Sequence, residues 1–202
     1  MAKYTDAQFI NHISTVLMDT GTAIWSTAHI SHEMQQQLRV ISRYRPVLAF
    51  STVTFASTAK ELVSTALTTM IGDPVAMEYE VNKDPKRYRN FEFRDGTVIP
   101  DINFTPTSGA TAFIWYNKAH VISGTTTNTL DPEEERILIQ LTVAELHRQK
   151  SGDLINTFPR GGPRSIVDFR EVAKERKEEA MQDLRSIADS HHHLVQDWPK
   201  VQ

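Results

Sequence analysis

The Arg45-Pro46 pair constrains the fold of this 202-residue chain more than any other feature, because it separates two kinds of sequence. Before the pair, apolar residues recur at helical spacing, namely Ile30, Met34, Leu38 and Ile41. After it, residues 47–58 are β-branched, aromatic and hydroxyl-rich, which is typical of extended strands. Proline disfavours the helical conformation of the residue before it. A helix over about 31–44 is therefore expected to end there, and a β region to begin.

Two of the other predicted helices flank this helix and the β region. Thr5 and Asp6 can cap a helix over about 6–19, whose apolar stripe comprises Phe9, Ile10, Ile13, Val16 and Leu17, and Gly21 ends it. Asp131 caps the next helix, about 132–150, and Pro132 occupies the first position, where its missing N–H costs nothing. The buried stripe of this helix is predicted to be Ile137, Leu138, Leu141 and Ala144, with Glu145 at its polar edge.

The last predicted helix runs over about 166–188 and is a heavily charged rod with one narrow apolar stripe. That stripe comprises Phe169, Val172, Ala173, Ala180, Leu184 and Ile187. Beyond it, residues 191–202 show no periodicity and are expected to form a C-terminal tail.

The β region covers about 47–122. Asp95-Gly96 within Phe91–Ile99 is typical of a tight primed turn, so this segment is predicted to be a hairpin. Other expected strands are Val75–Val81, Ile102–Thr105 and Thr111–Ile122, and Lys60–Met70 is a possible short helix. Short connections make the expected sheet of four or five strands antiparallel. The predicted fold is α+β: a helical bundle of two N-terminal and two C-terminal helices with an inserted antiparallel β region.

Length and composition favour one folding unit, residues 1–190, because 40% hydrophobic residues suffice for a modest core. The net charge of -3 comes from 22 basic and 25 acidic residues that are interspersed, which disfavours a broad phosphate-binding face. No cysteine is present, so disulfides and thiolate metal sites are excluded. No segment has the apolar length of a membrane span or the character of a secretion signal, so we expect a soluble intracellular protein with no membrane contact.

Histidines and carboxylates give weak indications of chemistry. His29 and His32 can share a helix face and, beside Glu33, suggest a metal-dependent hydrolase. Zinc needs three or four ligands, however, and no spacing ties a further histidine to this pair. Glu78 and Glu80 are expected on one face of a strand, where exposed surface glutamates are the common case. No catalytic motif appears, so the sequence predicts no enzyme, no cofactor and no metal.

Arginines provide an alternative function. The loop Arg160-Gly161-Gly162-Pro163-Arg164 has the composition of a phosphate cradle but lacks the lysine and hydroxyl residue that a Walker motif requires. Arg43, Arg45, Arg160 and Arg164 can serve a nucleic-acid-binding or regulatory module, or they can pair with other elements or subunits. Trp198, in the C-terminal tail, either packs back on its own domain or anchors the tail in another subunit.

The order of these segments resembles the head-to-tail connector (adaptor) proteins of tailed bacteriophages. The resemblance covers about Asp6 to Ala188 and rests on four segments and the start of the last helix, Ser165–Phe169. The four segments are the helix end Ser42-Arg43-Tyr44-Arg45-Pro46, the strand Met77–Val81, the strand ending near His120, and the acidic helix start at Asp131.

The resemblance implies a structural virion protein that forms a homo-oligomeric ring, a dodecamer, between the portal protein and the tail or neck proteins. DNA passes through the lumen without tight binding. The implied location is the virion neck, and the host cytoplasm during assembly. A C-terminal extension often reaches the portal in such proteins, so Leu194, Val195, Trp198 and Pro199 are the expected portal-binding residues.

Overall fold

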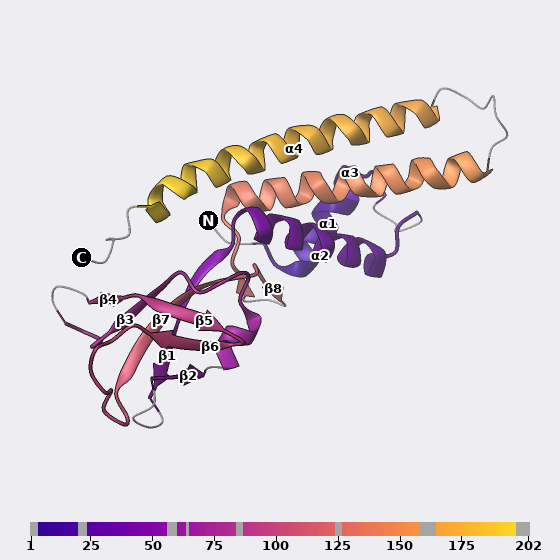
Figure 1. Cartoon of the computed structure of the whole chain (residues 1–202). Helices are drawn as coiled ribbons and strands as arrows, with labels where there is room; N and C mark the ends of the chain where they lie inside the picture. Colours follow the sequence, from indigo (N-terminus) through magenta and orange to yellow (C-terminus); the bar gives the residue numbers. More distant parts are fainter. Residues whose placement is uncertain are drawn as a thin grey trace. The chain divides into compact units, whose positions relative to one another are not determined.

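The chain has the predicted α+β fold, with four helices and antiparallel strands in the described part (Figure 1). The structure is a computed structural model that describes residues 4–19, 24–55, 60–63, 65–83, 87–123, 127–157 and 165–196. Two compact units are present. The helical unit contains residues 1–45 and 120–192, and the β unit contains residues 46–119. The β unit is therefore inserted between the second and third helices of the helical unit.

The helical unit consists of α1 (Asp6–Val16), α2 (Thr27–Tyr44), α3 (Pro132–Thr157) and α4 (Ser165–Gln196), with a small ribbon of β8 (Ile122–Ser123) and β9 (Thr127–Asn128). Figure 1 shows α3 and α4 running side by side. Apolar side chains from all four helices form one core, which includes Phe9, Ile13, Ile30, Met34, Leu38, Ile41, Ile137, Leu138, Leu141, Ala180 and Leu184.

Polar caps begin the helices. Thr5 is the N-cap of α1, as predicted, and forms a reciprocal capping box with Gln8. Ser26 accepts a hydrogen bond from the backbone of His29 and begins α2 at Thr27, four residues earlier than predicted. Asp131 accepts hydrogen bonds from the N–H groups of Glu133 and Glu134 and so caps α3.

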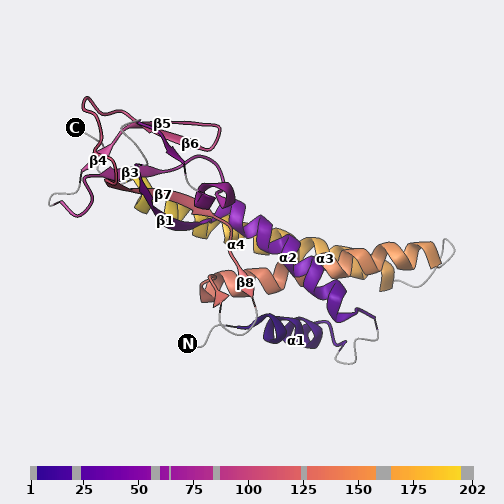
Figure 2. The same cartoon turned by 90° about the horizontal axis from the view of Figure 1, so that it is seen from below.

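The helix ends depart from the predicted bounds. α1 stops at Val16 because Met18 takes a positive φ of 55°, and Gly21 lies outside the described residues. α3 continues to Thr157 and α4 to Gln196, so residues 191–196 are helical and the prediction of a tail from 191 is wrong. The predicted apolar stripe of this helix ends at Ile187, but no glycine or proline follows it before Pro199, so no helix-breaking residue stops the helix at 190. Figure 2 shows the later half of α3 extending past α1 and α2.

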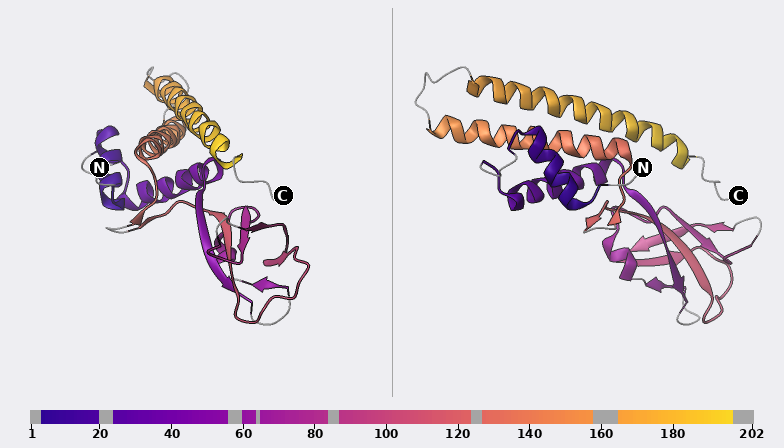
Figure 3. Two further views of the ribbon diagram at one scale, coloured as in Figure 1. Left: turned by 90° about the vertical axis from the view of Figure 1, so that its left-hand side faces the viewer. Right: turned by 180° about the vertical axis from the view of Figure 1, so that it is seen from behind.

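The β unit contains two antiparallel sheets instead of the single predicted sheet. One sheet has the order β1 (Val47–Thr54), β7 (Thr111–Lys118), β3 (Ala76–Tyr79) and β4 (Tyr88–Arg89). The other has the order β2 (Leu62–Val63), β6 (Thr97–Pro100) and β5 (Phe91–Arg94). Figure 3 shows β1 and β7 as long neighbouring strands. The core between the sheets includes Val53, Phe55, Leu62, Met77, Val98, Ala112, Ile114 and Tyr116.

The predicted hairpin is present, whereas two neighbouring predictions are wrong. Asp95 and Gly96 have φ values of 47° and 79°, as a type I′ turn between β5 and β6 demands. The short helix predicted over 60–70 is wrong in its extent: Leu62–Val63 form strand β2, which pairs with β6, and only Thr65–Thr69 are helical, as a 3₁₀ helix. Residues 102–105 form no strand, since Ile102 alone enters the core while Phe104 is exposed.

Candidate functional site

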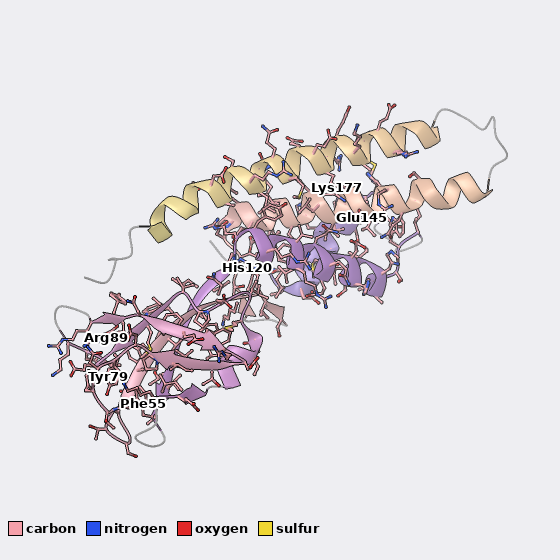
Figure 4. The ribbon with its side chains drawn as sticks, viewed as in Figure 1. Phe55, Tyr79, Arg89, His120, Glu145 and Lys177 are labelled. Carbon is pink, nitrogen blue, oxygen red and sulfur yellow. The ribbon has the colours of Figure 1, made fainter. Side chains whose placement is uncertain are left out.

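Four charged or ionisable side chains meet where α2 ends and α3 begins, and we call Arg45, His120, Asp131 and Glu134 the junction cluster. Arg45 Nη1 lies 2.6 Å from Asp131 Oδ2, and its Nε lies 3.3 Å from Glu134 Oε1. His120 Nε2 lies 3.6 Å from the same oxygen of Glu134. The cluster thus joins the C-terminus of α2 to the first turn of α3. Figure 4 labels one of its members, His120.

The capping geometry of α3 positions Glu134. Its backbone N–H donates to Asp131 Oδ1 at 2.9 Å, and its Oε2 accepts from the backbone N–H of Asp131 at 2.8 Å. This reciprocal pair is a capping box. Oε2 is therefore occupied by the cap, and Oε1 is the oxygen that faces Arg45 and His120.

His120 is held on both sides of its ring and by its backbone. The backbone N–H donates to Ser42 Oγ at 2.9 Å, and the Ser42 hydroxyl donates to the Leu38 carbonyl at 2.7 Å. Nε2 lies 2.6 Å from the Arg45 carbonyl oxygen, and Nδ1 lies 3.1 Å from the Thr129 hydroxyl. A carbonyl only accepts, so Nε2 carries a proton and donates to it.

Two members of the junction cluster, Arg45 and His120, mark the ends of the inserted β unit. The chain leaves the helical unit after Arg45 and returns at His120. The hydrogen bond between His120 Nε2 and the Arg45 carbonyl oxygen therefore joins the residue where the chain leaves the helical unit to the residue where it returns. The side chains of His120 and Glu134 are only 4% and 2% exposed, so the contact between them is shielded from solvent. The cluster therefore ties the end of α2, the segment at His120 and the start of α3 together within the helical unit.

Burial dominates the electrostatics of Glu134. It raises the pKa of this carboxyl group, and the nearby charge of Asp131 acts in the same direction. The backbone hydrogen bond from Asp131 and the charges of His120 and Arg45 lower the pKa and offset part of the rise. Removal of the Arg45 charge would therefore disfavour the ionised form of the Glu134 carboxyl group.

A second polar cluster joins α3 to α4. Glu145 lies against Arg148, whose Nε donates to Glu145 Oε1 at 2.6 Å, and Lys177 Nζ on α4 lies 3.5 Å from Glu145 Oε2. Figure 4 shows Glu145 and Lys177 facing each other. Burial raises the pKa of Glu145, but the hydrogen bond and charge of Arg148 and the charge of Lys177 outweigh it and lower the pKa. Glu145 is largely buried, not the exposed polar edge that the sequence predicts.

Of the arginine and tail residues singled out from the sequence, only Arg43, Arg45, Leu194 and Val195 lie in the described part of the chain. Arg45 bridges two elements of the helical unit, whereas Arg43 is exposed on α2. Arg160, Arg164, Trp198 and Pro199 lie outside the described residues. Leu194 and Val195 lie in α4, and the structure describes only their backbone.

The structure places the two histidines suggested as metal ligands on α2 and the two suggested strand glutamates at β3. His29 Nε2 lies 2.7 Å from Gln149 Oε1, and His32 is paired with Gln36. Within the described ranges, no group of three or more His, Asp or Glu residues is placed to hold a metal ion. Glu78 is buried, and Glu80 follows the end of β3 with a φ of 61°, so the prediction of two exposed glutamates on one strand face is wrong.

No protein-family model matches the sequence, and no curated protein matches it. None of the described helices combines the length and the apolar character that a bilayer span requires. A function can therefore be proposed only from the residues and the architecture of the chain itself.

Sequence reasoning missed Ser42 and Glu134 as members of the junction. The pattern Asp131-x-x-Glu134 is a capping-box signal and could have identified Glu134 as more than one of three acidic residues in a first turn. Ser42 carries no comparable signal. Its role depends on a backbone group 78 residues away.

Proposed function

We propose that this chain is a head-to-tail connector, or adaptor, of a tailed bacteriophage. The observation that carries the proposal is the architecture: two helices, an inserted antiparallel β unit, and two further helices. The resemblance implies this arrangement, and the chain has it. Its copies form a ring, a dodecamer, between the portal protein and the tail or neck proteins, in the virion neck. Before that, they assemble in the host cytoplasm.

The electrostatics support a passage for DNA without retention. Binding to a duplex through many lysine and arginine contacts would strengthen with each phosphate neutralised and would slow the passing DNA. The chain carries a net charge of -3, and Arg45 is engaged by two carboxylates. Both features favour the connector over the nucleic-acid-binding alternative.

The C-terminal residues are the proposed portal contact. Leu194 and Val195 lie on the last turn of α4, and Trp198 and Pro199 follow within three residues of its end. A tryptophan is a frequent anchor of protein interfaces. In this proposal α4 presents that anchor to the portal.

Native mass spectrometry and electron microscopy of the purified chain, alone and with the portal protein of the same phage, test the proposal. Twelve chains of 23.0 kDa give a particle of about 276 kDa. We expect a ring-shaped particle with a central channel that binds the portal. A chain that stays monomeric at tens of micromolar both alone and with the portal would refute the connector. Steeply salt-dependent retention of duplex DNA would favour the alternative.

A further inference from the structure

The helical unit has a groove between α1 and α3 that none of the described helices fills. Its volume is about 810 Å³. Gln8, His12 and Val16 of α1 line one side, and Ile139, Gln140 and Val143 of α3 line the other. The α1 residues recur every fourth position, so the groove follows the length of that helix.

The floor of this α1–α3 groove is apolar and its rim is cationic. Ile139 and Val143 are buried, but Val16, a member of the apolar stripe of α1, remains 38% exposed. Arg136 and Arg176 also line the groove, together with Glu135, which is buried and accepts a hydrogen bond from Asn128. The two arginines therefore set the charge of the exposed rim. Arg136 contacts Asp183 at 2.8 Å and is still 53% exposed, so its guanidinium has donors to spare.

The outer face of α4 has the complementary character. Glu171, Glu175 and Glu179 lie four residues apart on one exposed row, and no ion pair is found for any of them in the described part of the chain. Val172, beside this row, is 37% exposed. The row lies opposite Ala180 and Leu184, which pack into the core of the helical unit, and opposite the buried Ala173.

We propose that the α1–α3 groove receives the outer face of α4 from a second copy of the chain. Val172 of the second copy covers the exposed apolar group of Val16, and Glu175 and Glu179 face Arg176 and Arg136. Charge complementarity selects this occupant: an acidic row without internal ion pairs is matched to a basic rim. The contact joins two different surfaces, as a ring of copies requires. The inference rests on the proposed function, because it names the contact from which that ring is built.

Cysteine cross-linking tests the contact directly, because the chain contains no cysteine of its own. Gln140→Cys places a thiol in the groove, and Glu175→Cys places one on α4. We expect the two variants, mixed and mildly oxidised, to give a disulfide-linked dimer that neither gives when mixed with Arg39→Cys, an exposed α2 control. Absence of the dimer from a mixture in which the particles form would overturn the proposed contact.

A blocking substitution separates this inference from the connector proposal. Gln140→Trp fills the groove and is expected to convert the assembled particle to monomers, whereas Arg39→Trp leaves it assembled. Circular dichroism establishes that both variants are folded. Assembly of the unmodified chain and of Gln140→Trp alike would overturn the groove contact and leave the ring intact. An unmodified chain that stays monomeric both alone and with the portal protein would overturn both.

Discussion

The guanidinium group of Arg45 lies 2.6 Å from Asp131 and also faces Glu134, so one residue at the end of α2 is tied to two carboxylates at the start of α3. The pairing spans more than 80 residues of chain, including the whole β unit. Because one of the two carboxylates is almost fully buried, the contact differs in kind from an exposed ion pair.

Arg45→Met is expected to destabilise the helical unit by about 3 kcal/mol, because it leaves the buried Glu134 carboxylate without its partner. The same substitution in a Glu134→Gln background costs less, since no unpaired charge remains. Chemical denaturation of the four chains in this double-mutant cycle measures the difference. Lys174→Met, which removes an exposed pair with Glu178, serves as the control and is expected to change stability by less than about 1 kcal/mol. Equal costs in both backgrounds would contradict the coupling.

Glu134 and Glu145 are expected to give opposite pH dependences. The raised pKa of Glu134 means that its contribution to stability is present below the unfolded-state pKa and is lost as pH rises through the folded-state pKa. The lowered pKa of Glu145 means that its contribution is present above the unfolded-state pKa and is lost as pH falls through the folded-state pKa.

The test compares the unmodified chain with Glu134→Gln and with Glu145→Gln from about pH 7 to about pH 3, a range that extends above and below the ordinary glutamate pKa of about 4.3. As pH falls, the unmodified chain is expected to gain stability relative to Glu134→Gln and to lose it relative to Glu145→Gln. The free energy of unfolding at each pH decides the sign. Two differences that change in the same direction would show that the opposite local environments do not govern these groups.

Local signals made much of the fold predictable. The cap at Asp131, the apolar stripe of α2 and the Asp95-Gly96 turn each act within a few residues, and each appears in the structure as predicted. The division of the strands into two sheets was not predictable in the same way. Strand pairing depends on residues distant in sequence, such as Leu62 with Val98, and on the packing that surrounds each strand.

The candidate site shows the same limit. Arg45 was a recognisable residue because Pro46 follows it, but the sequence could not identify Asp131 and Glu134 as its partners. Val16 and Val172 fit an apolar stripe by spacing, and the structure nevertheless leaves both exposed. Periodicity identifies a helix face, but the width of the face that neighbouring helices cover is a property of the packing.

Ser42→Ala is expected to cost about 1–3 kcal/mol, because it leaves the buried backbone N–H of His120 without an acceptor. Ser151→Ala is the matched control. Its hydroxyl is also buried and donates to a helix carbonyl, that of Arg148, and no described N–H donates to it. Denaturant titrations of both variants should therefore give a clearly larger loss for Ser42→Ala. A loss no greater than that of the control would count against the hydrogen bond as a support of the junction.

Gly96→Ala is expected to destabilise the β5–β6 hairpin by about 1 kcal/mol, since an L-residue at a φ of 79° meets a steric penalty that glycine avoids. Asp95→Asn is expected to be neutral, because asparagine also tolerates positive φ. Amide hydrogen exchange of residues 91–100 reports the change locally. Unaltered protection in Gly96→Ala would mean that the turn relaxes to another conformation at no cost.

The helical course of α4 to Gln196 sharpens the test of the proposed portal contact. Deletion of residues 191–202 removes the last turns of this helix together with Trp198, so loss of portal binding in that variant has two explanations. Truncation after Gln196 keeps the helix and removes the proposed anchor.

We expect Trp198→Ala to weaken portal binding by about 30-fold, the effect of losing an interface anchor worth about 2 kcal/mol. The truncated chain should bind no better than Trp198→Ala, and Lys200→Ala should bind like the unmodified chain. Binding titrations with purified portal protein give these affinities. Full affinity of the truncated chain would exclude Trp198 and Pro199 from the contact and would leave Leu194 and Val195 as the residues to substitute.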